Sequence, residues 1–209
     1  MLDGGEILGV EVRDDTMAAT AIAFESSSFM ACRTRVIGVE DSFAAGERLA
    51  RALEPAGLVH VLVLANGIRV NGSALVKGLT ARLPAGVVVT GGLAGDAGRF
   101  VKTFVVSDGE AESDTVAAVG LYGDRLRVGC GSLGGWDPFG PERLITRSKG
   151  NVLFELDGKS ALELYKNYLG EHARGLPASG LLFPLTMRGE GGGRASSAPS
   201  SASTRRSAA

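Results

Sequence analysis

The stretch "LVHVLVLANGIRVNGSALVKGLTARLPAGVVVT", residues 58–90, decides the fold. It opens with a near-continuous apolar run, which is typical of a strand covered on both faces. Leu75, Leu79 and Leu83 follow at positions i, i+4 and i+8, and they predict an amphipathic helix that Pro84 ends. "GVVVT", residues 86–90, reads as a second buried strand. Strand, helix and strand within this distance predict a βαβ unit with parallel strands and a right-handed crossover.

The flanking sequence adds further strands and helices to this unit. The predicted strands are 6–12 and 16–24 as a hairpin, then 27–38, two around a turn at 107–110, 125–136 and 151–156. The predicted helices are 41–57 and 157–170, and Asp157 with Gly158 would cap the second. The fold class is therefore α/β (mixed α+β): a mixed parallel/antiparallel sheet with a central βαβ unit and covering helices.

Composition excludes several classes of protein. The formal net charge is −1, so nothing in the charge balance favours a nucleic-acid or membrane surface. Apolar runs are too short for a membrane span, and the N-terminus lacks a signal peptide. Cys32 and Cys130 stand far apart, which indicates neither a zinc site nor a disulfide framework and favours a cytoplasmic location.

The loops that follow the two parallel strands are the first candidate site, because open α/β sheets bind ligands at the carboxyl ends of their strands. Asn66 follows the first strand, and Gly91, Gly92 and Asp96 follow the second. Their glycine spacing fits neither a dinucleotide fingerprint nor a P-loop. Three interpretations stay open: a tight turn with Asp96 as its cap, backbone N–H groups that hold a small anion or carboxylate, and an enzyme that binds a phosphorylated cofactor there.

Histidine and tryptophan give the other candidates. His60 lies inside an apolar strand, where a core role is the commoner one, and His172 follows a predicted helix. Neither has neighbours at metal-ligand spacing, so no metal site is predicted. Trp136 lies in the constrained loop "GGWDPFGP", where its ring either packs a corner or lines a ligand pocket. No catalytic constellation stands out.

Several ordered motifs together resemble the FIST domain family of sensory domains. They are "GGEILG", "NGIRVNGSALVKGL", "GGLAGD" with "GRF", the run from "VAAVGLYG" through "GGWDPFGP" to "ELDGKSALELYKNYLG", and "LFPL". The resemblance covers roughly residues 4–186. It implies a partial FIST N-type domain at 1–148 and the start of a FIST C-type domain at 149–187, and the composition of 188–209 predicts a disordered tail.

The resemblance implies a non-catalytic, cytoplasmic module of signal transduction that binds an amino acid or similar metabolite. Its output would pass to a signalling partner such as a kinase or receptor. The ligand residues it implies are Gly91, Gly92, Asp96, Trp136 and Asn66. No cofactor is expected, with one alternative.

That alternative is haem, because a subset of the family binds haem and responds to nitric oxide. It would use His60 or His172 as the axial ligand. Family members also extend further at both ends, so a truncated or frameshifted fragment without function is a further alternative.

Overall fold

The computed structural model describes residues 6–13, 16–96, 99–131 and 139–188. The chain forms two compact units, the first through Gly131 and the second beyond it. The FIST domain boundaries expected above, at 148 and 187, are a different division and stay a prediction. So does the disorder of the tail, which apart from Arg188 lies outside the described residues.

The first unit is built on a four-stranded sheet with the strand order β3-β8-β4-β5. Its strands are β3 (Ser28–Arg35), β4 (Leu58–Asn66), β5 (Val88–Ala94) and β8 (Thr115–Tyr122). β4 and β5 are parallel and are joined through α2 (Gly72–Thr80), while β8 is antiparallel to both β4 and β3. The predicted βαβ unit and the mixed sheet are therefore confirmed.

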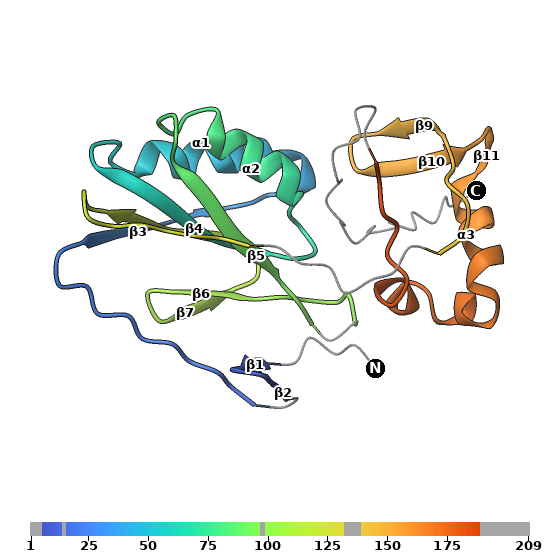
Figure 1. Cartoon of the computed structure of the whole chain (residues 1–209), viewed down its shortest axis with the longest axis horizontal. Coiled ribbons are helices and arrows are strands. Elements are labelled where there is room, and N and C mark those ends of the chain that lie inside the picture. Colours follow the sequence, from blue (N-terminus) through green and yellow to red (C-terminus); the bar gives the residue numbers. More distant parts are fainter. Residues whose placement is uncertain (1–5, 14–15, 97–98, 132–138, 189–209) are drawn as a thin grey trace. The chain divides into compact units, whose positions relative to one another are not determined.

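Two helices cover one face of this sheet, as Figure 1 shows. α1 (Ser42–Ala52), which follows the 3₁₀ turn Val39–Asp41, packs with α2 over β4 and β8. Alternate side chains of the strands point toward the helices and pack with helix side chains to form the core of the unit. Its fully buried members include Val61 and Val116 of the sheet and Leu49 and Leu79 of the helices. Burial of branched aliphatic side chains is what fixes the sheet against the helices.

α1 and α2 approach each other backbone to backbone. A Cβ placed on Gly46 of α1 would overlap the Leu75 carbonyl oxygen and lie 2.7 Å from the Leu79 nitrogen. A Cβ placed on Gly78 of α2 would overlap the carbonyl oxygen of Phe43. Only residues without a side chain allow helices to pack this closely.

The other face of the sheet, which we call the open face, carries a small hairpin. β6 (Val105–Ser107) and β7 (Glu110–Glu112) form it, and Figure 1 shows it on the side opposite the helices. Val105 is buried between the hairpin and the sheet. The turn predicted at 107–110 is confirmed as the connection of this hairpin, and β8 follows as a separate strand.

Three of the predicted strands, 6–12, 16–24 and 125–136, are wrong. Thr16 to Phe24 has no strand pairing among the described residues, and the N-terminal hairpin forms instead within 6–13, from β1 (Glu6–Leu8) and β2 (Glu11–Arg13). Gly9, with a φ of 64°, provides the turn between these two strands, so the predicted single strand 6–12 is itself a hairpin. Residues 125–131 are likewise not a strand, and 132–136 lie outside the described residues.

The second unit combines a three-stranded antiparallel sheet with a helix. The strands are β9 (Ile145–Lys149), β10 (Val152–Leu156) and β11 (Lys159–Ser160), followed by α3 (Ala161–Leu169) and the 3₁₀ turns Gly170–Gly175 and Ala178–Leu181. The predicted cap of α3 is wrong. Ser160 caps it by accepting from the Glu163 N–H, while Asp157 accepts from the Leu144 N–H and pairs with Arg143.

Candidate functional site

The carboxyl ends of β4 and β5 lie side by side, as the βαβ unit requires. Asn66 is in register with Ala94, two residues before Asp96. The βαβ unit predicts that Asn66 and the start of the Asp96 loop lie at the same edge of the sheet, and in the structure they do. What remains is whether their polar atoms are available to a ligand.

The side chain of Asn66 is buried and its hydrogen bonds are used within the protein. Its Nδ2 donates to the carbonyl oxygens of Thr103, at 3.1 Å, and Ser113, at 2.6 Å. Its Oδ1 accepts from the backbone N–H groups of Ile68, at 2.8 Å, and Arg69, at 2.7 Å. Asn66 thus ties the end of β4 to the segments before β6 and β8, which is a structural role.

Asp96 is held in the same way by its own loop. Its Oδ1 accepts from the Phe100 N–H at 2.9 Å, and its Oδ2 accepts from the N–H groups of Val101 and Lys102 at 2.7 and 3.1 Å. Desolvation raises the pKa of this carboxyl, but the three N–H donors together outweigh it, so the pKa lies below its usual value. The carboxylate of Asp96 therefore accepts from three backbone N–H groups of its own loop, which agrees with the interpretation that Asp96 caps a turn.

Gly91 and Gly92 are not in a turn, which corrects the sequence prediction. β5 extends through both of them, in register with Val63 and Leu64 of β4. A Cβ on Gly91 would overlap the carbonyl oxygen of Val63, whereas a Cβ on Gly92 would meet nothing within 4 Å. Gly91 is needed for close packing of strands, and the open turn begins only after Ala94.

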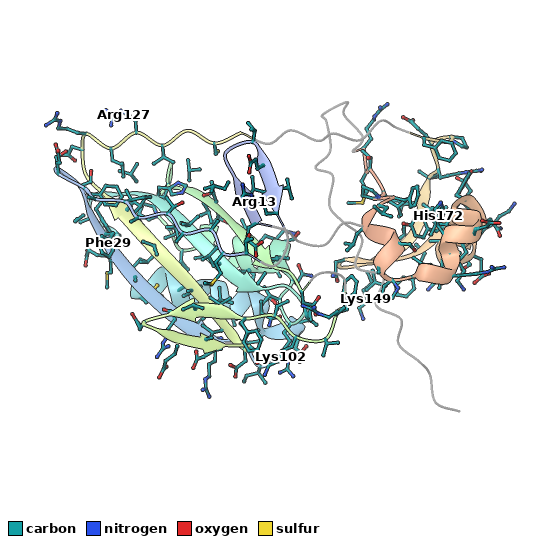
Figure 2. The ribbon with its side chains drawn as sticks, turned by 90° about the horizontal axis from the view of Figure 1, so that it is seen from below. Arg13, Phe29, Lys102, Arg127, Lys149 and His172 are labelled. Carbon is teal, nitrogen blue, oxygen red and sulfur yellow. The ribbon has the colours of Figure 1, made fainter. Side chains whose placement is uncertain are left out.

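The two histidines are in different settings. His60 is 4% exposed, and its Nε2 shares a 2.9 Å hydrogen bond with Thr90 Oγ1. Its Nδ1 has no partner in the part of the chain that the structure describes, and burial lowers the pKa of the ring. His172, labelled in Figure 2, is exposed in the second unit, with its ring 5.1 Å from that of Phe183.

The surroundings of the two histidines also bear on metal and haem binding. Within the described ranges, no group of three or more His, Cys, Asp or Glu side chains could hold a metal ion. The ring of His60 is enclosed, and the groove next to its strand holds about 220 Å³. Ligand pockets for drug-sized molecules hold about 300–1,000 Å³. The haem alternative at His60 or His172 stays a prediction. Trp136 lies outside the described residues.

That groove on the open face is the candidate site. It lies between the sheet and the β6–β7 hairpin. Its floor is made of small and aliphatic side chains from β3, β4 and β8: Ala31, Leu62, Leu64, Ala117 and Val119. Val106, Ser107 and Asp108 of the hairpin form its wall. An apolar floor with a few polar groups at one side is typical of a small-ligand site.

Ion pairs hold the hairpin over the sheet. Arg33 of β3 lies 3.2 Å from Glu110 and 3.7 Å from Glu112 of β7, and its Nε is 4.0 Å from Asp108 at the hairpin turn. Hydrogen bonding to Thr115 and the charge of the neighbouring arginines lower the pKa of Glu112. These pairs are largely exposed, so each contributes only modestly to stability. Together they fix where the wall of the groove stands.

The sequence missed this groove because its residues carry no catalytic or metal-binding chemistry. The apolar run of β4 is the signal that could have found it. A strand with apolar side chains on both faces requires a cover on each face of the sheet, and α1 and α2 cover only one. Leu62 is 41% exposed and Leu64 49%, which is unusual for the central strand of a sheet. Phe29, labelled in Figure 2, extends the exposed apolar surface along β3.

The first unit is thus a helix-covered mixed sheet with a small apolar groove on its open face. The FIST N domain model matches residues 3–159, and the chain belongs to this family. FIST domains are sensory, non-catalytic modules of signal transduction. Among the described residues, no helix is both long and apolar enough to cross a membrane.

One curated relative matches part of the chain. It is Uncharacterized protein MJ1623 of Methanocaldococcus jannaschii, 32% identical over 88 residues. The match spans 42% of this chain but only 17% of that relative's length. No solved structure matches the chain.

Proposed function

We propose that the first unit senses a small metabolite, such as an amino acid, in the groove between the β6–β7 hairpin and the open face of the sheet. The observation that carries the proposal is the groove itself, about 220 Å³, apolar on its floor and polar at Ser107 and Asp108. A ligand with an aliphatic part and one or two charged groups matches both. Family membership supports the sensory role.

The ligand residues proposed here differ from those expected from the sequence. Asn66 and Asp96 have their hydrogen-bonding atoms engaged inside the protein, so they shape the edge of the sheet. After β5, the N–H groups of Phe100, Val101 and Lys102 are occupied by Asp96, so these three are not free to bind a phosphate. Signal output would pass through the hairpin to a partner protein in the cytoplasm, such as a kinase or receptor.

A thermal-shift screen against amino acids, nucleotides and haem tests the proposal. A ligand present at about 100 times its Kd stabilises the folded state by about 2.7 kcal/mol. For a unit of about 130 residues this raises Tm by about 10 °C. Amino acids are expected to give such a shift and nucleotides none. No shift with any amino acid would refute the proposal.

A pair of variants locates the site. Ala31→Phe fills the groove and should abolish the shift, whereas Val88→Leu, on the same face but outside the groove, should retain it. An unchanged shift in Ala31→Phe would place the ligand elsewhere. Haem stays an alternative prediction, tested by a Soret band on titration and its loss in His60→Ala or His172→Ala.

A further inference from the structure

The first unit contains an extended segment with no strand partner. Met17 to Phe24, "MAATAIAF", is uncharged and lies along an exposed course between β2 and β3 in Figure 1. Met17 is 97% exposed and Ile22 71%. Within the described ranges its backbone pairs with no strand. The segment has β-branched, aromatic and small apolar residues and neither charge nor proline. This composition is typical of segments that pair with a free strand edge.

The same unit contains an edge with matching properties. β5 pairs only with β4 in the described part of the chain, which leaves one row of its backbone N–H and C=O groups free. From Leu83 to Gly95 the sequence has no charged residue and, within β5 itself, no proline. Natural edge strands are usually protected by such residues or by a bulge. At Gly92 of this strand, nothing lies within 4 Å of the position that a Cβ would take.

The segment cannot reach this edge within its own chain. Three residues, Glu25 to Ser27, separate it from β3, and the four Cα–Cα steps from Phe24 to Ser28 span at most ~14 Å when extended. A strand added outside β5 stands four strand spacings from β3, or ~19 Å. The edge of β3 is within reach, but the structure does not fold the segment back onto it.

We propose that two copies of this chain associate by strand addition, in which Met17–Phe24 of each copy pairs with the free edge of β5 of the other. This reciprocal exchange gives a two-fold arrangement in which the unpaired segment and the free β5 edge of each copy are both paired. It adds a fifth strand to each sheet and covers apolar surface that is exposed in the single chain. The surface is distinct from the groove that we propose as the ligand site.

Light scattering of the full chain gives the first test. The expected mass is twice 21.5 kDa at high protein concentration, falling toward a single chain on dilution. Thr20→Pro removes a backbone N–H in the middle of the segment and should leave a monomer. Ser26→Pro, in the exposed connection just outside it, is the matched control and should remain a dimer.

Complementation of two variants gives the decisive test. Val88→Lys places a charge on the β5 edge and should also yield a monomer. A mixture of Thr20→Pro with Val88→Lys restores one segment and one edge, so native mass spectrometry should detect a heterodimer that neither variant forms alone. A monomeric wild-type chain, a dimer that survives Thr20→Pro, or the lack of a heterodimer would each overturn the proposal.

Discussion

Replacing either of two adjacent glycines in β5 should have opposite consequences. In Gly91→Ala the new Cβ overlaps the carbonyl oxygen of Val63 and lies 2.8 Å from its carbonyl carbon. The obstacle is the backbone of the central strand, so no rotamer change relieves the overlap. β5 must shift away from β4 or lose part of their pairing.

The size of the effect follows from this geometry. Overpacking in a core costs about 1–3 kcal/mol, and an obstacle that is backbone places Gly91→Ala at the upper end of that range. With an unfolding entropy of about 2.1 cal/mol/K per residue over about 130 residues, a loss of about 3 kcal/mol lowers Tm by about 10 °C. Calorimetry together with urea unfolding measures both quantities.

Gly92→Ala is the matched control, because the Cβ there meets nothing within 4 Å. It restricts the unfolded chain and should change stability by less than about 1 kcal/mol, in the stabilising direction. Equal destabilisation by the two substitutions, or a Gly91→Ala protein as stable as the wild type, would refute the assignment of Gly91 to close strand packing.

Three further predictions concern buried or engaged polar groups. Asn66→Ala should lower the free energy of unfolding, measured by urea titration, by about 2–4 kcal/mol, because it leaves buried carbonyl and N–H groups unpaired. Asn71 caps α2 by accepting from the Ala74 N–H, and Asn71→Ala should cost only about 1 kcal/mol in the same titration. The pKa of Asp96 is lowered in the folded state, so its carboxylate stabilises the folded protein above about pH 4, and this stabilisation is lost as pH falls through the folded pKa. The drop in Tm between pH 6 and 3 should therefore be smaller in Asp96→Asn than in the wild type. The pKa of His60 is also lowered in the folded state, so the unfolded chain takes up the proton at a higher pH than the folded one. The free energy of unfolding should therefore fall as pH drops below about 6.5, and His60→Gln should remove that part of its dependence on pH.

Most of the sheet was predictable because its strands and helices follow hydrophobic period. The apolar run of β4 and the i, i+4 spacing of α2 were enough to give the βαβ unit, and the turn at 107–110 gave the β6–β7 hairpin. The segment 16–24 was misread because strand propensity does not tell whether a partner edge is available. Pairing is a property of two segments, and only one of them is in the local sequence.

The site was harder to predict than the fold. Polar residues at the carboxyl ends of parallel strands marked Asn66 and Asp96, and the structure does bring those ends together. Sequence could not show that their oxygens are already satisfied by backbone N–H groups from residues up to six positions away. The groove was invisible for the opposite reason, since Leu62 and Leu64 look like ordinary core residues until the second face of the sheet is found uncovered.

The reciprocal contact of α1 with α2 limits how this protein can evolve. At Gly46 and Gly78 the atoms that exclude a side chain belong to the main chain of the opposite helix. A clash between two side chains can be repaired by a second mutation that shrinks one of them. Here every amino acid at Leu75 or Phe43 presents the same carbonyl, so no compensating substitution exists at the point of contact. After either glycine is replaced, the packing of the two helices can be restored only by moving a whole helix, so single compensating substitutions cannot rescue a change at these two positions.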